Sequence, residues 1–460
     1  MYCKPTAPFS ITIQTRFDTV RRQLAALAVS VLALAGCSDP APKFGEIGAI
    51  EGFVGGAIVE EPRAALVARD ILSAGGTAAD AATAAFFTLT VTYPVAVGLG
   101  GGGACLYYDR SADKVETVDF RLRPPENGGA IWVPGALRGM AMLHSRYGRI
   151  RWSQLLSPAE KSARFGHRIS RALAKRIAPQ AARLKNDDMA AGLFLHPDGT
   201  PKGEAEDLVQ VELAATLTRI RTRGVGDLYG GEAGRRLQQS ALAHGGKMTI
   251  TDLRGYRAVW RKSATHEVGN HMLHVPTFGS ADQLDNPALK LINLASGNSG
   301  ENIAVKVFRQ ADIEMSVDRG EGGFVIGDSF GSAAACVYQM NGAFGSGKMA
   351  PNLGLFLAPA TKRGDATWPG YPLPLLGVNE PLGQAVMAAV GTGGPKAAAA
   401  AVRVSLATMG QGAPLAKTMA GKNGAGVQAL WCPKGIRVGP KTCRFATDPK
   451  GFGLAVFDKF

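Results

Sequence analysis

Residues 98–109, GLGGGGACLYYD, place five glycines within six positions, directly before a short run of β-forming residues. A phosphate-binding loop would instead lead into a helix and end with Lys and Ser or Thr, so that backbone N–H groups point at the anion. This segment continues as Ala-Cys-Leu-Tyr-Tyr, a polar turn and a second extended run at 115–119. The pattern predicts a glycine turn, a strand, a turn and a strand, with glycines that permit close backbone packing.

Helix signals follow an extended segment at 53–59. A helix predicted at 62–74 stops at the pair Gly75-Gly76, which is a typical glycine C-terminus. The next helix begins with the capping box Thr77-Ala78-Ala79-Asp80 and continues toward Pro94. Because this helix is apolar nearly all round, we expect it to be buried.

Later in the chain, short helices give way to short apolar runs between glycines. One helix is expected to start with Ser157 as N-cap and Pro158 as its first residue, and to end before Gly166. Further helices are predicted at 209–222, 231–244 and 395–409, and further strands at 324–326, 333–340, 353–357, 427–431 and 454–457. Strands near both ends with helices between them predict a layered α/β sandwich.

The N-terminus has the features of an export signal. Arg21 and Arg22 precede the apolar run 24–35, and the sequence Leu-Ala-Gly-Cys ending at Cys37 resembles the lipobox of bacterial lipoproteins. Ser38 fits outer-membrane sorting by the same resemblance. We therefore predict an exported, periplasmic protein anchored to the outer membrane through lipidated Cys37; an ordinary signal peptide with an incidental cysteine is the alternative. The predicted division is a signal peptide at 1–36, a linker at 37–52 and one domain at 53–460.

Export places the protein where disulfides form. Beyond residue 37 the chain has four cysteines, which allow three complete pairings. Cys432 and Cys443 flank a turn-rich segment and are the expected bridge. Cys105 and Cys336 both fall in expected buried strands, where a free thiol packs as a small apolar group, and their pairing stays open.

Charge and hydropathy argue against a nucleic-acid partner and against a membrane-spanning helix after the N-terminal segment. The formal net charge is +14, but basic residues are spread along the sequence and aromatic residues make up only 7%. A nucleic-acid-binding surface would concentrate both, so no nucleic-acid partner is predicted. After the N-terminal segment there is no run of about 18 apolar residues, so no membrane-spanning helix is expected.

Two motifs suggest a catalytic or metal site without completing one. GDSFG at 327–331 matches a nucleophile elbow with Ser329, but that fold needs a histidine after the serine and the last histidine is His274. HEVGNHMLH contains His266, His271 and His274. In one extended strand, His266 and His274 would share a face and His271 would lie on the other, which favours a polar strand face. No metal and no cofactor are predicted.

A longer set of segments, taken in order, carries a family resemblance. They are EEPRAALVARDILSAGGTAADAATAAFFTLTVTYP, GLGGGGACLYYD, VDFRLRPP, VPGALRGMAMLHSRYGRIRWSQLLSPA, GGKMTITDLRGYRAVWR and FGSGKMAPNLGLFL. Together they resemble gamma-glutamyltranspeptidases over residues 56–357, with a fainter match to residue 395. The resemblance implies an α/β fold, the αββα sandwich of N-terminal-nucleophile hydrolases, with a large-subunit-like part at 53–320 and a small-subunit-like part at 321–460. It also implies hydrolysis or transfer of the γ-glutamyl group of glutathione-like peptides.

The family's nucleophile is missing at the matching position. In the family, a threonine hydroxyl first cleaves the peptide bond before it, and the freed threonine then forms a γ-glutamyl ester with its α-amine as base. The family's Thr-Thr-His-aromatic run matches Glu321-Gly322-Gly323-Phe324. A carboxylate has no O–H to add across an amide, and the nearest upstream hydroxyl is Ser316, five residues away. Neither self-cleavage nor acyl transfer by this route is expected.

Other positions retain residues that the resemblance assigns to a site. Arg121 matches the arginine that binds the substrate α-carboxylate, and an internal salt bridge is its alternative role. Asn341 matches a substrate-binding position. Gly393 and Gly394 match the oxyanion-hole glycines, although GTGG is one residue shorter than the family's GSPGG.

Three departures from the family pattern weaken the match. The carboxylate-binding serine pair appears as Pro374-Leu375, and the acidic residue that binds the substrate amine falls near Arg363, which has the opposite charge. The helical stretch that normally precedes the threonine is reduced to a short connection at 296–320.

These observations leave three interpretations of function. The first is a degenerate family member that stays a single chain and has little or no transpeptidase activity. The second is an active exported amidohydrolase or gamma-glutamyltransferase with a different nucleophile or substrate. The third is a non-catalytic lipoprotein that binds a small γ-glutamyl or other acidic ligand in the same cleft.

Overall fold

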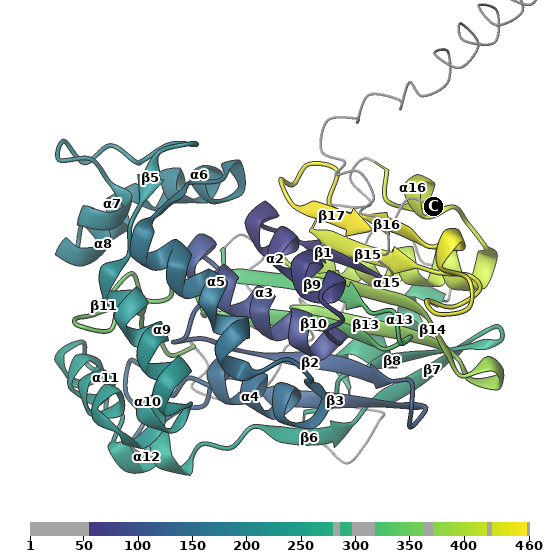
Figure 1. Cartoon of the computed structure of the whole chain (residues 1–460), viewed down its shortest axis with the longest axis horizontal. Coiled ribbons are helices and arrows are strands. Elements are labelled where there is room, and N and C mark those ends of the chain that lie inside the picture. Colours follow the sequence, from purple (N-terminus) through teal and green to yellow (C-terminus); the bar gives the residue numbers. More distant parts are fainter. Residues whose placement is uncertain (1–54, 279–285, 297–317, 362–370, 421–425, 458–460) are drawn as a thin grey trace, which may run out of the picture. The chain divides into compact units, whose positions relative to one another are not determined.

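In a computed structural model of the chain, two antiparallel β-sheets are stacked face to face between two layers of helices (Figure 1). The structure describes residues 55–278, 286–296, 318–361, 371–420 and 426–457. This layer order confirms the predicted αββα sandwich. The predicted signal peptide and Cys37 lie outside the described residues.

The first sheet has seven strands in the order β17-β1-β9-β10-β2-β3-β6, each antiparallel to its neighbours. Its strands are β17 (Leu454–Phe457), β1 (Gly56–Val59), β9 (Glu321–Gly327), β10 (Ala333–Gln339), β2 (Gly102–Asp109), β3 (Lys114–Phe120) and β6 (Val259–Lys262). Strand β9 is the third of the seven; Glu321 at its first position pairs with Gln339 of β10, whereas β1 pairs only with residues 324–327.

The second sheet has six strands in the order β16-β15-β14-β13-β8-β7. They are β16 (Arg444–Ala446), β15 (Val427–Trp431), β14 (Gln384–Gly391), β13 (Leu373–Asn379), β8 (His271–Val275) and β7 (Ala264–Val268). Two further pairs lie outside the sandwich, β4 (His167–Arg168) with β5 (Asp207–Leu208), and β11 (Met349–Ala350) with β12 (Leu355–Phe356).

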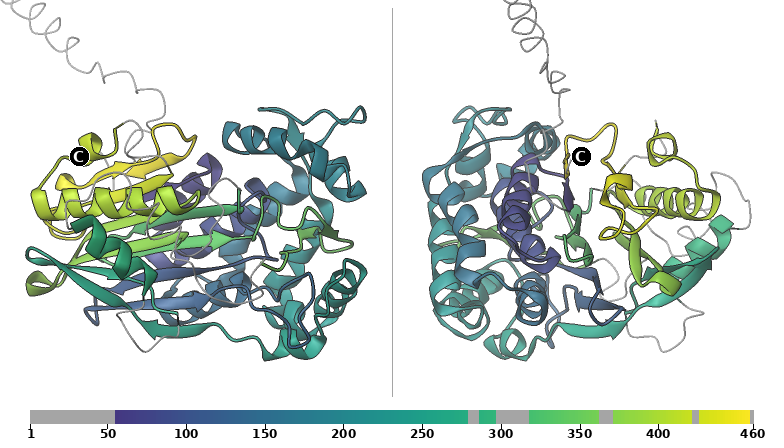
Figure 2. Two further views of the ribbon diagram at one scale, coloured as in Figure 1. Left: turned by 180° about the vertical axis from the view of Figure 1, so that it is seen from behind. Right: turned by 45° about the vertical axis from the view of Figure 1, so that its right-hand side comes forward.

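Helices cover the outer face of each sheet (Figure 2). On the first sheet they are α2 (Pro62–Ser73), α3 (Ala78–Thr92) and α4 (Ala136–Tyr147), with α5 (Trp152–Phe165) packed on α3 and α9 (Val211–Arg223) packed on α5. The same half carries α6 (Arg171–Ile177), α7 (Ala181–Leu184), α8 (Asp188–Phe194), α10 (Gly226–Gly230), α11 (Glu232–Ala243) and α12 (Ile250–Gly255). On the second sheet the helix is α15 (Pro395–Gln411), with α13 (Pro287–Ser296) and α16 (Leu415–Thr418) beside it.

Strand β9 contributes side chains to two apolar cores, one on each face of the first sheet. Phe324 and Ile326 belong to the core between the first sheet and its helices, whereas Val325 belongs to the core between the two sheets. Because successive side chains of a strand point to opposite faces, a strand buried on both sides has a continuous apolar run. This explains why β9 lacks a polar alternation from Phe324 to Ile326.

The glycine-rich segment packs against neighbouring backbone, as predicted. A Cβ added to Gly100 would lie 2.0 Å from the main-chain oxygen of Phe356, and one added to Gly103 would lie 2.0 Å from that of Val337. Both distances are far below van der Waals contact, so any side chain at these positions would push strands apart. The glycines therefore serve close packing at the start of β2.

Capping signals predicted one helix start correctly and another wrongly. The capping box at the start of α3 is complete: Thr77 Oγ1 accepts the N–H of Asp80, and the Asp80 carboxylate accepts the N–H of Thr77. By contrast, Ser157 is not an N-cap, because α5 begins at Trp152 and contains Pro158 in its interior. A proline at this place removes one hydrogen bond, to the carbonyl of Gln154, which is at an exposed position where water can bind instead.

The histidine-rich segment forms a hairpin, so the expected faces were wrong. Strands β7 and β8 pair with Val268 opposite His271 and with Thr265 opposite His274. The turn between them brings His266 and His271 to one face and leaves His274 on the other. A strand prediction that ignored the turn at 269–270 therefore misplaced His271.

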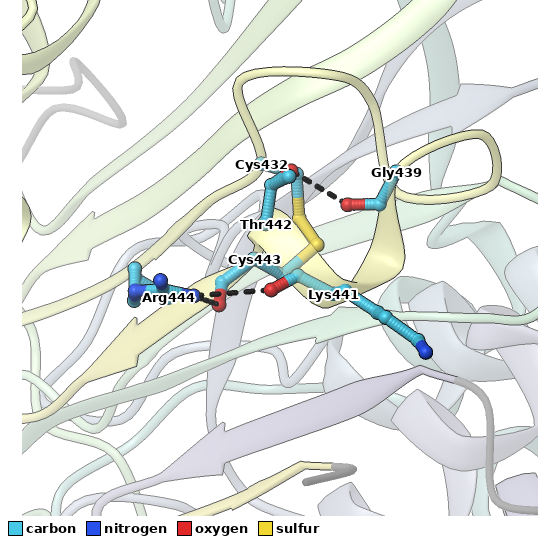
Figure 3. Close-up of a disulfide and its surroundings, with 6 residues drawn as sticks. All are labelled: Cys432, Gly439, Lys441, Thr442, Cys443 and Arg444. Carbon is cyan, nitrogen blue, oxygen red and sulfur yellow. Dashed lines mark hydrogen bonds between the residues drawn. A yellow bond between two sulfur atoms is a disulfide. The ribbon is translucent and has the colours of Figure 1, made fainter. Parts of the chain in front are cut away.

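Two disulfides link the four cysteines of the described residues. Cys432 and Cys443 close a short loop (Figure 3). Cys105 and Cys336 lie directly opposite each other on β2 and β10, with Cα atoms 4.1 Å apart, and are also bonded. The sequence left the pairing of Cys105 and Cys336 open; in the structure their bond joins the parts of the chain before and after Glu321.

Candidate functional site

Glu321 lies at the beginning of β9, is 3% exposed, and has its main chain held by Arg176 of α6. The Arg176 guanidinium donates to the main-chain oxygen of Glu321 at 3.2 Å and to the Tyr93 hydroxyl at 3.1 Å. Its Nε and Nη2 atoms donate to the two carboxylate oxygens of Asp318. Arg176 therefore joins the segment that enters β9, at Asp318 and Glu321, to Tyr93 at the end of α3.

The Glu321 carboxylate occupies an anion-binding site at the N-terminus of α15. Its Oε2 atom accepts the N–H of Gly393 at 2.9 Å and that of Gly394 at 2.7 Å. These two glycines have φ values of 102° and 91°, a region that favours glycine and that directs successive N–H groups toward one acceptor. The helix dipole of the 17-residue α15 adds positive potential at the same place.

Burial and hydrogen bonding act on Glu321 in opposite directions. Burial raises its pKa, and the N–H groups of Gly394 and Gly393 partly offset that rise by stabilising the charged form. The second carboxylate oxygen, Oε1, is buried and has no hydrogen-bond partner among the described residues. One oxygen of the carboxyl group thus accepts two hydrogen bonds from the glycines, and the other is available to a proton or a ligand.

A second carboxyl group lies beside the first. Glu60, directly after β1, accepts a hydrogen bond from the Thr392 hydroxyl, and Thr392 immediately precedes Gly393. The pKa of Glu60 is raised to about 7, mainly by burial; the Thr392 hydrogen bond and the charge of Arg176 oppose the rise, and the nearby Glu321 carboxylate adds to it. The 392–394 segment therefore donates hydrogen bonds to two neighbouring carboxyl groups, those of Glu60 and Glu321.

These groups line a cavity of about 460 Å³. Among its described lining residues, hydroxyl groups come from Tyr93, Thr392 and Thr447. Of these, only Thr392 is hydrogen-bonded to a carboxylate and adjacent to the N–H groups of Gly393. The cavity can accept a proton at its carboxyl groups and can bind an anion at its glycines, but position 321 supplies no O–H group.

Arg121 does not reach this cavity. It follows β3 and makes a bidentate ion pair with Asp119, with Nε and Nη2 at 3.0 and 3.1 Å from the carboxylate oxygens. Its guanidinium also stacks on Phe278 at 4.1 Å. Glu321 lies at the same end of the sheet but three strands away, about 14 Å at the usual strand spacing. The internal salt bridge is therefore the role that the structure gives Arg121.

The remaining predicted positions are also separate from the cavity or outside the described residues. The side-chain amide of Asn341, just after β10, donates to the main-chain oxygen of Pro359 at 2.9 Å. Pro374 and Leu375 are buried within β13 and offer no hydroxyl. Arg363 lies outside the described residues.

Sequence reasoning missed several residues of the cavity. Glu60 belongs to the pair Glu60-Glu61 after an apolar strand, a signal that could have been followed, although Glu61 itself caps α2. Arg176 and Asp318 carry no local pattern, because their pairing joins segments 142 residues apart. Such a contact follows from the tertiary fold alone.

Comparisons with known proteins relate the chain to one family. A family model described as gamma-glutamyltranspeptidase matches residues 64–291, which ends before Glu321. The glutathione hydrolase proenzyme of Bacillus subtilis strain 168 is 34% identical over 217 residues, which are 42% of this chain and 37% of that protein. The acylase ACY 1 proenzyme of Pseudomonas sp. strain V22 is 34% identical over 239 residues, 46% of this chain and 42% of that protein. In these alignments the chain spans about two fifths of each relative.

A solved structure supports the fold over nearly the whole chain. The cephalosporin acylase from Bacillus halodurans superposes with a TM-score of 0.66, covering 92% of this chain and 100% of that chain. The sequence identity is 19%, so this likeness concerns the fold. The superposition supports the same sandwich fold for the part of the chain that contains Glu321, which the family match does not reach.

Proposed function

Because this chain belongs to the gamma-glutamyltranspeptidase family, we propose that it is a degenerate member that remains a single chain and does not transfer γ-glutamyl groups. One observation carries the proposal: Glu321 Oε2 accepts both N–H groups of Gly393 and Gly394. The side chain at the nucleophile position thus fills the place that the resemblance assigns to the substrate oxyanion. It has no hydroxyl to form the γ-glutamyl ester of the family's route, and it competes with any carbonyl oxygen for the same donors.

The competition is strong in physical terms. A hydrogen bond to a charged group contributes about 1.5–3 kcal/mol, and two of them converge on one oxygen of Glu321. An amide carbonyl is neutral before attack and binds such donors more weakly than a carboxylate does. A γ-glutamyl substrate would therefore have to displace a better acceptor that is covalently held in place.

Incubation of the purified protein with a chromogenic γ-glutamyl anilide is expected to release no dye. Reducing denaturing electrophoresis is expected to show one chain; a reductant is essential, since the Cys105–Cys336 bond would hold two cleaved fragments together. Glu321→Gln is the matched control, because it keeps the shape and still lacks a hydroxyl, and it should behave as the unaltered protein. Rapid dye release, together with a break before residue 321, would contradict the proposal.

The rival interpretation, an active amidohydrolase with a different nucleophile, is favoured by one group. The Thr392 hydroxyl contacts the Glu60 carboxylate, an arrangement in which a base can take the proton of a nucleophile. If the protein does release dye and Thr392→Val abolishes the release, the rival is correct. Ser329 follows the far end of β9 and lines another cavity, so Ser329→Ala should have no effect in either case.

The proposed location is the periplasmic side of the outer membrane, with Cys37 lipidated. The lipobox-like sequence and the charged pair before the apolar run support it. Cells expressing the full chain are expected to incorporate labelled palmitate into the protein and to retain it in the membrane fraction. Cys37→Ser should lose both the label and the membrane fraction; a labelled Cys37→Ser protein would refute lipidation at this residue.

A further inference from the structure

We propose that a second cavity, at the opposite end of β9 from Glu321, binds a small molecule that carries two or more phosphate or carboxylate groups. The cavity has a volume of about 710 Å³, and four arginines line it: Arg110, Arg146, Arg149 and Arg437. Sites for small ligands commonly measure roughly 300–1,000 Å³. The length of β9 separates the two cavities by about 20 Å, so this site is independent of the one at Glu321.

Two of the arginines, Arg110 and Arg437, have the first atoms of their side chains close to Gly331. A Cβ added to Gly331 would lie 3.0 Å from the Cβ of Arg437 and 3.3 Å from the Cγ of Arg110. The main chain of Arg110 is fixed by a hydrogen bond from its N–H to Ser332 Oγ. Its Nε atom is buried and has no acceptor among the described residues, so a donor in this cavity lacks a partner. An anion bound here would supply it.

The other two arginines are oriented by aromatic rings. The Arg149 guanidinium lies 4.2 Å from the centroid of Phe330, and that of Arg146 lies 4.7 Å from the centroid of Trp260. Stacking holds the guanidinium plane and leaves its N–H edge for hydrogen bonds. Arg146 also pairs with Glu116 at 2.9 Å. Within the described part of the chain, the other three arginines have no carboxylate at ion-pair distance.

The acids of the cavity are bound by their own chain. Asp109 accepts the N–H and hydroxyl of Ser111 through one oxygen. The carboxylate of Asp328 accepts three main-chain N–H groups, from Ala78, Phe330 and Ser332. Four arginines face two lining aspartates and Glu116, the partner of Arg146, so positive charge exceeds negative charge by one and the cavity favours an anion. The three arginines that have no carboxylate partner among the described residues can bind more than one acidic group of the same ligand.

The chemistry of the lining selects planar or tetrahedral oxyanions. Guanidinium groups bind carboxylate and phosphate with paired N–H donors, and the hydroxyl group of Ser329 adds a neutral donor. The disulfide between Cys432 and Cys443 closes the loop that carries Arg437 (Figure 3). That cross-link limits the movement of Arg437 and lowers the entropy lost when a ligand is bound.

Calorimetric titration with inorganic pyrophosphate and, separately, with citrate tests the proposal. At least one probe is expected to bind the purified protein and to bind more weakly as salt is added. Arg110→Gln and Arg437→Gln should each weaken binding about tenfold, the loss of one charge-assisted hydrogen bond. Arg235→Gln, at an exposed position on α11, is the matched control and should leave the affinity unchanged. Thermal unfolding without ligand checks that each variant folds.

Each outcome decides the matter. Binding of pyrophosphate, citrate or both, weakened at Arg110 and Arg437, supports the site and identifies the anion it prefers. Absence of heat and of thermal stabilisation at about 10 mM of both probes overturns it, as does binding that the two variants leave intact. If only phosphatidylglycerol vesicles bind, and the variants abolish that binding, the arginines contact a membrane surface and the small-molecule proposal is wrong.

Discussion

Replacing both Cys105 and Cys336 by alanine is expected to lower the free energy of unfolding by about 5 kcal/mol. The two residues are 231 positions apart in sequence, and a cross-link that closes so long a loop greatly restricts the unfolded chain. Both side chains are fully buried between helices and sheet, so alanine also leaves a small cavity there. Urea unfolding of the double variant, measured without reductant, gives the loss directly.

The second disulfide provides the matched comparison. Cys432 and Cys443 are 11 positions apart, so the same loop argument predicts a smaller loss, about 3 kcal/mol, for Cys432→Ala with Cys443→Ala. The order of the two losses is the critical result. Equal losses, or a larger loss for the short loop, would show that local packing rather than chain restriction determines the contribution of each bond.

Complete local signals allowed parts of the fold to be predicted. The start of α3 was correct because Thr77 and Asp80 satisfy each other's N–H groups within four residues. The start of α5 was wrong because Ser157-Pro158 has the same composition as a helix start, while the helix had already begun at Trp152. The faces of the histidines were wrong because a hairpin turn changes the alternation. Errors therefore arose where a local pattern is compatible with two backbone paths.

The candidate site could be predicted only in part, for a different reason. The resemblance placed Glu321 and the pair Gly393-Gly394 at matching positions, and the structure joins them by hydrogen bonds. It also assigned Arg121 to the site, whereas Asp119 binds that side chain elsewhere on the sheet. A family pattern predicts the role of a residue only when the residues around it also match the family. Here the nucleophile has changed, so the contacts around position 321 could be found only in the structure.

Stability is expected to fall between about pH 4.5 and pH 7 because of Glu60, and Glu60→Gln should remove that part of the fall. Burial raises the folded-state pKa of Glu60 from 4.5 to about 7. Between these values the folded protein binds a proton that the unfolded chain has released, so the stabilisation from Glu60 is complete below pH 4.5 and is lost as pH rises through 7. The full change is about 3 kcal/mol. Glutamine can keep the Thr392 contact and cannot ionise.

The difference between the two proteins is the quantity to measure, since other buried groups titrate in the same range. Asp328, with a pKa near 6, acts in the same direction as Glu60. Burial lowers the pKa of His167 and of His274 from 6.5 to about 4, so these histidines favour the folded state increasingly as pH rises. Their effects cancel when Glu60→Gln is compared with the unaltered protein at each pH.

Urea unfolding at pH 4 and pH 8 should therefore show equal stability for the two proteins at the lower pH, and a gain of about 3 kcal/mol for Glu60→Gln at the higher pH. Glu126→Gln, a substitution at an exposed position, controls for the loss of a carboxylate as such. A loss for Glu60→Gln at pH 8 would mean that ionised Glu60 is stabilised by Arg176 more than burial penalises it. In that case the cavity would hold a charged base beside the Thr392 hydroxyl, and the rival amidohydrolase would gain support.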